Sequence, residues 1–177
     1  YPEKFDGVSD GIDIWHKNIV IEELARIAVG GLSATLMVHG IGLPPVLNFA
    51  SEAIKQEVAP PVLAGTKRIS LAITEPGAGS DVAHLTTTAR LDGDHYVVNG
   101  SKTYITGGMN ANWFTTAVRT GGEGAGGVSA LLIPADLEGV SRTALDKKQG
   151  WWCSDTATIY FDNVRVPAAN LVGQENR

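Results

Sequence analysis

Residues 72–81 read AITEPGAGSD and come directly after an apolar run that begins at Ile69. A proline, two glycines, a serine and two acids within this stretch are typical of a phosphate-binding loop, an acid/base site or a turn between strands. If the stretch is only a turn, we expect Pro76–Gly77 at its corner, Asp81 bonded to its own backbone and Glu75 in water. The residue types alone leave the three interpretations open.

The same stretch carries groups that are suited to holding a ligand. Gly77 and Gly79 allow a ligand to approach the backbone closely, and consecutive N–H groups there would form an anion-binding nest. Thr74 and Ser80 add hydroxyls, which both donate and accept hydrogen bonds. The sequence around the loop therefore has to decide between a ligand site and a plain turn.

The part of the chain before this loop has the pattern of short amphipathic helices. Apolar residues recur at helical spacing within residues 20–28. We expect Gly30–Gly31 to end this helix and Ser33 to cap the next one. A further helix is predicted to begin at Ser51 and to close where Pro60–Pro61 is followed by Leu63, Ala64 and Gly65. The helix glycines are expected to serve close packing.

From residue 67 onward the periodicity is that of strands. Hairpin signals occur at Asp92–Gly93 and Asn99–Gly100, and a hinge between two short strands is expected at Asp162–Asn163. Turn signals about every eight to twelve residues, without intervening helices, predict an antiparallel β-sandwich or barrel. The predicted fold class is α+β, with a helical part at residues 1–66 and a β-domain at residues 67–177.

Composition and charge argue against several functions. The chain has 177 residues and a formal net charge of −5, and no cluster of Lys or Arg is present that would bind nucleic acid. Glycine and proline interrupt the apolar run at residues 34–49, so we expect no membrane span. The four histidines lack metal-motif spacing, so no metal is expected. No GxGxxG motif follows a strand and opens a helix, so any dinucleotide would be held by the β-domain.

Several single residues are interpreted as structural. Cys153 has no cationic neighbour in the sequence and is expected to be a small core residue. Trp151–Trp152 is expected to serve packing or a subunit contact. His39 is predicted to be a core histidine with its hydrogen bonds satisfied, whereas His84 and His95 flank hairpins and are expected in water.

Three ordered blocks identify the kind of domain. They read TEPGAGSD at residues 74–81, NGSKTYIT at residues 99–106 and GWWCSDTATIYFDNVRVP at residues 150–167. Their order and spacing resemble the middle β-domain of the acyl-CoA dehydrogenase family, the flavoenzymes that oxidise the Cα–Cβ bond of acyl-CoA thioesters. The preceding residues resemble the last part of the family's N-terminal helical domain, so the resemblance covers essentially the whole chain.

The resemblance implies FAD as the cofactor. Thr74 would lie against the pyrimidine edge of the isoalloxazine ring, and Ser80 between the FAD pyrophosphate and the pantetheine arm of the substrate. Tyr104 stands where many members carry Trp and would pack beside the flavin, and Thr106 would address the N5 region. A flavin that accepts hydride needs donors at N5 and at the O2/N1 edge. The implied cofactor-binding residues are Leu71, Ile73, Thr74, Gly79, Ser80, Tyr104, Ile105 and Thr106, of which Ser80 also binds substrate.

The resemblance also implies a catalytic base outside this chain. In the family, a glutamate of a C-terminal helical domain removes the α-proton while hydride leaves the β-carbon, and nothing here resembles the sequence around that glutamate. Glu75 and Asp81 belong to the flavin loop and are not expected to replace it. We therefore expect a segment of a dehydrogenase that desaturates an acyl-CoA. The alternatives are an acyl-CoA oxidase or flavin monooxygenase of the same fold, or a non-catalytic β-sandwich binding module.

Expectations for the parent enzyme follow from the same resemblance. Electron-transfer flavoprotein is the implied electron acceptor, the assembly is a homo-tetramer or dimer, and the location is the cytoplasm or the mitochondrial matrix. The 177 residues alone are expected to be inactive and to bind FAD weakly or not at all.

Overall fold

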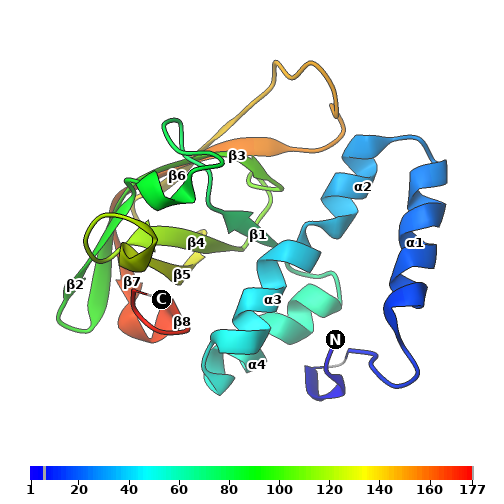
Figure 1. Ribbon diagram of the computed structural model, residues 1–177, viewed down its shortest axis with the longest axis horizontal. Helices are drawn as coiled ribbons and strands as arrows, with labels where there is room; N and C mark the ends of the chain where they lie inside the picture. Colours follow the sequence, from blue (N-terminus) through cyan, green and yellow to red (C-terminus); the bar gives the residue numbers. More distant parts are fainter. Residues whose placement is uncertain (6, 177) are drawn as a thin grey trace.

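Helices form the first part of the molecule and strands the rest in the computed structural model, which describes residues 1–5 and 7–176 (Figure 1). The helices are α1 (Ile14–Arg26), α2 (Gly30–Met37), α3 (His39–Phe49) and α4 (Glu52–Leu63), after the 3-10 turn η1 (Glu3–Phe5). The strands are β1 (Ile69–Ala72), β2 (Thr88–Asp92), β3 (His95–Thr106), β4 (Trp113–Arg119), β5 (Val128–Pro134), β6 (Val140–Ala144), β7 (Thr156–Pro167) and β8 (Leu171–Val172). Further 3-10 turns are η2 (Val82–His84), η3 (Ala125–Gly127) and η4 (Ala168–Asn170). The predicted α+β class is confirmed.

The boundary between α1 and α2 differs from the prediction. Gly30–Gly31 does not end a helix, because α1 already ends at Arg26 and Ala28 turns the chain with a φ of 57°. The two glycines instead open α2. Ser33 therefore lies inside α2, whose N-cap residue Val29 makes no side-chain cap.

The boundaries of α4 agree with the prediction at both ends. The Ser51 hydroxyl accepts a hydrogen bond from Ile54 N at 3.4 Å, which confirms Ser51 as the N-cap. The helix ends at Leu63 with Ala64 as its C-cap, which lies in the predicted closing stretch. The carbonyl of Pro60 still accepts a bond from Ala64 N at 2.9 Å, so these prolines are tolerated in the last turn.

Glycines do bring the helices close to the β part. A Cβ atom at Gly42 of α3 would lie 3.2 Å from the carbonyl oxygen of Ile69 in β1. The Thr115 hydroxyl of β4 donates to Gly42 O at 2.7 Å. At Gly31 a Cβ atom would lie 2.7 Å from Cys153 Sγ. The close-packing expectation is confirmed at Gly31 and Gly42, whereas Gly40 has no neighbour within 4 Å of an added Cβ.

One helical stretch meets the length and composition test for crossing a membrane. Gly30–Phe49 spans 20 residues with a mean hydropathy of 1.2, and Pro44 and Pro45 lie inside α3 instead of interrupting it. This corrects the expectation that glycine and proline interrupt the apolar run at residues 34–49. Core helices and signal sequences share this length and composition, and Leu43 and Val46 of this stretch are fully buried against the sheet and α4.

The strands form one eight-stranded sheet in the order β6-β7-β3-β2-β4-β5-β8, with β1 paired to β4. Most neighbouring strands are antiparallel, in agreement with the prediction. β1 is nevertheless parallel to β4, with Ile69 opposite Trp113, and β2 meets β4 in parallel at Thr88 and Arg119. The β2–β3 hairpin separates β1 from β4 along the chain. The sheet is therefore mixed.

Of the predicted turn signals, Asp92–Gly93 forms its hairpin, whereas the others are bulges. β3 runs unbroken through Asn99–Gly100, where its register against β7 shifts and Gly100 has a φ of 142°. β7 likewise runs through Asp162–Asn163, where Asn163 has a φ of 51°. Asn163 N donates to Asn99 Oδ1 at 2.9 Å, so the two irregularities face each other. Bulges bend paired strands without ending them.

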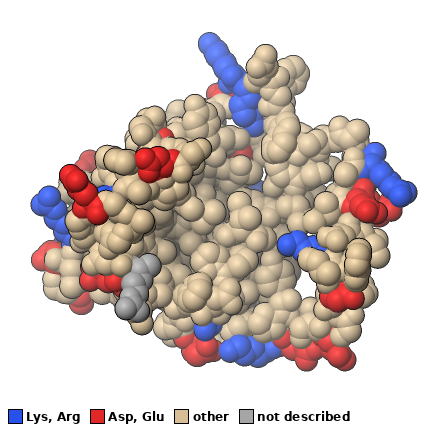
Figure 2. Space-filling view, in the orientation of Figure 1, with Lys and Arg blue, Asp and Glu red and all other residues tan. Residues whose placement is uncertain are grey.

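Two hydrophobic clusters stabilise the molecule. The first lies within the curved sheet and the second between the sheet, α3 and α4; their largest members include Phe114, Leu131, Ile133 and Ile159 in the first, and Leu43, Val46, Val58 and Ile69 in the second. α1 contributes no buried residue, and its Trp15 is 69% exposed. Figure 2 shows charged side chains mainly around the rim of one face of the molecule, with a largely uncharged centre.

Gly100→Ala is expected to destabilise the chain by about 2 kcal/mol or more. The substitution adds a side chain where φ is 142° and where a Cβ atom would lie 2.7 Å from Thr87 Cα. Gly150→Ala is the matched control, because nothing lies within 4 Å of an added Cβ there. Urea unfolding of both variants measures the difference, and equal stabilities would contradict the assignment of Gly100 to a close backbone contact.

Candidate functional site

The TEPGAGSD stretch is a tight turn with an open outer side. Glu75 N donates to Ala78 O at 2.9 Å and Ala78 N donates back to Glu75 O at 3.2 Å, which places Pro76–Gly77 at the corner. That part of the turn interpretation is confirmed. Gly79 and Ser80 are exposed, and a Cβ atom added at Gly77 or Gly79 would meet nothing within 4 Å. These glycines therefore serve no internal packing and leave room for a ligand.

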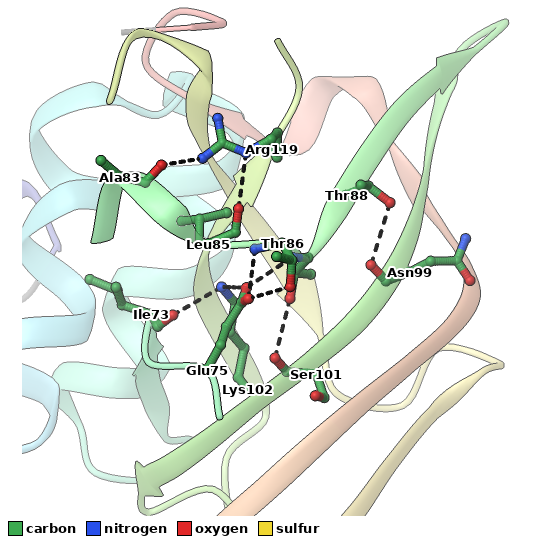
Figure 3. Close-up of polar contacts among 11 residues, drawn as sticks. Ile73, Glu75, Ala83, Leu85, Thr86, Thr88, Asn99, Ser101, Lys102 and Arg119 are labelled. Carbon is green, nitrogen blue, oxygen red and sulfur yellow. Dashed lines mark hydrogen bonds and ion pairs between the residues drawn. The ribbon is translucent and has the colours of Figure 1, made fainter. Parts of the chain in front are cut away.

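Glu75 is buried in an ion pair, so the expectation that it lies in water is wrong (Figure 3). Lys102 Nζ of β3 lies 2.8 Å from Glu75 Oε1 and donates also to the carbonyl of Ile73 at 3.0 Å. Glu75 Oε2 accepts from Thr86 N at 2.6 Å and from the Thr86 hydroxyl at 2.8 Å, and Oε1 accepts from Thr87 N at 2.9 Å. Both carboxylate oxygens are thus fully engaged.

The electrostatics of this pair make Glu75 unsuited to act as a base. Burial alone would raise the pKa of Glu75, but the ion pair with Lys102 and the hydrogen bonds from Thr86 and Thr87 lower that pKa to about 2. Burial lowers the pKa of Lys102, and the Glu75 carboxylate offsets part of that effect. A carboxylate of such low basicity with both oxygens bonded cannot readily remove a proton from carbon.

The loop lies alongside the end of β3, where the other predicted residues are found. Thr103 N donates to Thr74 O at 2.8 Å. Further along, a Cβ atom at Gly107 would lie 3.0 Å from Ser70 Oγ. Residues 70–74 and 103–107 therefore run side by side in opposite directions. This arrangement brings Leu71, Ile73 and Thr74 together with Tyr104, Ile105 and Thr106.

These residues differ in what they present to a ligand. Leu71, Ile73, Thr74 and Thr106 are half-buried. The Ile105 side chain is in the sheet core, so only its backbone is available.

Tyr104 has an unusual backbone conformation. Its φ is 58°, at a register shift of β3 between Lys102 and Ile105, and its side chain is 69% exposed. A left-handed conformation at a residue other than glycine costs about 1–2 kcal/mol. The bulge turns the phenol ring outward into a surface depression of about 610 Å³ that residues 144–149 also line. An outlier of this kind is a reason to look for function.

The turn after Thr106 is held by Asp155, just before β7, and by Arg142 of β6. Gly107 N donates to Asp155 O at 2.9 Å, and Met109 N donates to Asp155 Oδ2 at 2.8 Å. Arg142 of β6 donates to the carbonyls of Met109 at 2.9 Å and Ala111 at 3.1 Å. The end of β3 is therefore fixed by an aspartate and an arginine that the sequence analysis did not single out.

The histidines and acids of the loop region are mostly at the surface. Asp81 does not cap its own backbone, because its carboxylate instead lies 2.6 Å from Nδ1 of the exposed His84. His95 is partly exposed and contacts Asp94 at 2.6 Å. His39 is half-buried beside the Tyr1 ring, at 6.0 Å between ring centroids. Among residues 1–5 and 7–176, no group of three or more His, Cys, Asp or Glu side chains could hold a metal ion.

The residues of the loop between β6 and β7 are more exposed than predicted. Cys153 is exposed, so its prediction as a core residue is wrong: it lies in this loop, over Gly31, and not in a strand. Trp151 and Trp152 are 62% and 79% exposed. Trp151 lies against Gly30, and Trp152 Nε1 donates to Lys148 O at 2.7 Å. Most of the paired tryptophan surface is therefore not used for packing within the described residues.

The sequence analysis overlooked Lys102 although a signal was present. Tyr96, Val98 and Lys102 lie at even positions of β3 and are all buried. A lysine in register with buried apolar residues needs a buried partner. The prediction of a hairpin at Asn99–Gly100 broke the strand before Lys102 and hid this pattern.

The comparisons with known proteins define the class. Residues 1–66 match the family described as acyl-CoA dehydrogenase, N-terminal domain, and residues 70–164 match acyl-CoA dehydrogenase, middle domain. The chain therefore belongs to the acyl-CoA dehydrogenase family.

Individual relatives agree with this class. The chain is similar to the acyl-CoA dehydrogenase apdG of Emericella nidulans, with 43% identity over 92% of the chain and 38% of the relative. It resembles an acyl-CoA dehydrogenase structure from Geobacillus kaustophilus with a TM-score of 0.92 and 35% identity, over 99% of this chain and 46% of that one. It also resembles a Bacillus anthracis acyl-CoA dehydrogenase complexed with FAD, with a TM-score of 0.89 and 36% identity, over 99% of this chain and 30% of that one. The chain spans less than half the length of these relatives.

Stability is expected to fall in acid because of Glu75. The pKa of Glu75 is about 2 in the folded chain and about 4.5 in the unfolded chain. Its contribution to folding stability is therefore complete above pH 4.5 and is lost as the pH falls towards 2. The loss amounts to at most about 3 kcal/mol. Urea unfolding of the chain and of Glu75→Gln between pH 2 and pH 7 tests this, and parallel pH profiles would contradict it.

Proposed function

We propose that the whole protein that carries this chain is an FAD-dependent acyl-CoA dehydrogenase that desaturates the Cα–Cβ bond of an acyl-CoA thioester. One observation supports this most strongly: residues 70–74 and 103–107 lie side by side in a chain of this family. Thr74 and Thr106 are thereby carried by two neighbouring segments of the chain. When bound, FAD supplies the acceptor for the hydride that leaves the β-carbon.

The residues present fit such a cofactor. Gly79 and Ser80 leave the outer side of the loop open, so a phosphate could approach their backbone. Thr74 would donate a hydrogen bond to the pyrimidine edge, and Thr106 would do so near N5. Tyr104 would pack its exposed ring beside the flavin. Leu71, Ile73 and Ile105 complete the proposed binding wall, in part through their backbone.

The remaining roles are divided between this chain and the rest of the protein. Ser80 would also contact the pantetheine arm of acyl-CoA. Glu75 is engaged with Lys102, which supports a catalytic base outside residues 1–177. We further propose a domain boundary between residues 66 and 67, electron-transfer flavoprotein as the electron acceptor, a dimer or tetramer as the assembly, and the cytoplasm or mitochondrial matrix as the location.

Anaerobic mixing of the full-length protein with butyryl- or octanoyl-CoA is expected to bleach the flavin absorbance. Thr74→Val and Thr106→Val should each weaken FAD binding roughly tenfold, since each removes a hydrogen bond of about 1.4 kcal/mol. Thr143→Val on β6 is the matched control, because that exposed threonine lies in no proposed contact. An unbleached flavin, or hydrogen peroxide formed in step with substrate under air, would favour the monooxygenase or oxidase alternative. A full-length protein without affinity for FAD would favour the binding module.

The 177-residue chain alone is expected to show no turnover of butyryl- or octanoyl-CoA with an artificial electron acceptor, because the catalytic base is proposed to lie outside it. FAD should separate from it on gel filtration. Turnover, or a yellow chain after filtration, would contradict the division of roles proposed here.

A further inference from the structure

Glu75 and Lys102 are the only charged residues that are buried within residues 1–5 and 7–176. Lys102 is fully buried and Glu75 is 5% exposed. Neither side chain can donate to or accept from a ligand at the loop surface, because their polar atoms bond to each other and to neighbouring backbone. Their role must therefore be indirect.

The pair joins three parts of the chain that are separate in sequence. Lys102 belongs to β3 and reaches back to the carbonyl of Ile73, at the start of the loop. Glu75 reaches forward to the amides of Thr86 and Thr87, just before β2 (Figure 3). Both ends of the segment 73–87 are thus tied to one point on β3.

Apolar packing does little to hold the outer part of this segment. Pro76, Gly77, Gly79 and Ser80 are all exposed, and Ala78 is its only buried residue between positions 76 and 81. Glycines also increase the conformational freedom that has to be lost when the loop is ordered. Besides the mutual bonds of Glu75 and Ala78 and the bond from Thr103 N to Thr74 O, the ion pair is the restraint that joins this segment to β3.

A buried ion pair is a poor device for stability alone. The cost of removing two charges from water is large, and well-packed apolar residues at the same place are often as stabilising or more so. Charged groups instead form several directional hydrogen bonds, which fix the relative position of the segments that they join. Four donors converge on Glu75 here: Lys102 Nζ, Thr86 N, Thr86 Oγ1 and Thr87 N.

We propose that Glu75 and Lys102 are positioning residues that fix residues 73–81 onto β3, so that Thr74 and Ser80 keep one orientation toward FAD. The inference rests on the proposed function for its ligand. Lys102 acts from the same strand that carries Tyr104 and Thr106. Both sides of the proposed flavin site are therefore attached to one strand, through the ion pair and through the bond from Thr103 N to Thr74 O at 2.8 Å.

The first test is amide hydrogen exchange of the ligand-free chain. The variant E75Q/K102M removes both charges and so leaves neither one buried alone. Exchange at residues 74–81 is expected to accelerate at least tenfold, with less than a twofold change in β4 and β5. The control variant D92N/R165M removes an exposed ion pair of equal length, 2.8 Å, and should leave residues 74–81 unchanged. Uniform acceleration through the sheet, or no acceleration in the loop, would overturn the proposal.

The second test uses the full-length protein. E75Q/K102M is expected to weaken FAD binding at least tenfold and, at saturating FAD, to slow flavin reduction by acyl-CoA at least tenfold, which lower stability alone would not produce. Normal affinity and normal reduction in spite of a loosened loop would overturn the positioning role. If the wild-type protein binds no FAD, the proposed function fails, while the exchange experiment still decides whether the pair orders the loop.

Discussion

The contact between Glu75 and Lys102 is the constraint on which the arrangement of the candidate site depends. Its atoms lie 2.8 Å apart in the interior, where neither charge can be hydrated. Since an unpaired charge there would be costly, the chain is held to the conformation in which the two meet. That conformation puts the TEPGAGSD turn against β3 and so brings Thr74 to the strand that carries Thr106. The acyl-CoA dehydrogenase family membership gives this arrangement its proposed meaning, a wall of a flavin site.

Local chemistry in the sequence predicted much of the fold. The serine cap of α4, the Asp92–Gly93 hairpin and the change from helices to strands follow from residues whose effect is confined to their neighbours. The errors arose where distant packing overrides local preference. Asn99–Gly100 favours a turn, but β7 pairs along the whole of β3 and converts it into a bulge. The parallel pairing of β1 with β4 depends on the path of the chain and has no local signal.

The sequence predicted only part of the candidate site, again because some of its contacts join residues that are far apart in the chain. The ordered sequence blocks predicted the loop at residues 74–81 and the TYIT segment at residues 103–106 as parts of the site. The structure does bring Thr74 next to Thr103. What the sequence could not supply is which side chains support them. Lys102 contacts Glu75 across 27 positions, and Arg142 contacts Met109 across 33 positions. Such contacts exist only in the folded chain. The alternation of buried residues in β3 was the one signal that indicated Lys102, and the turn expected at Asn99–Gly100 concealed it.

The most direct test of this account is a crystal structure of the full-length protein with FAD. We expect the hydroxyls of Thr74 and Thr106 to lie at hydrogen-bonding distance, about 3 Å, from the pyrimidine edge and the N5 region of the flavin. Glu75 and Lys102 should keep their contact behind the loop. A flavin bound elsewhere, or a loop that has left β3 to meet it, would contradict the central claim.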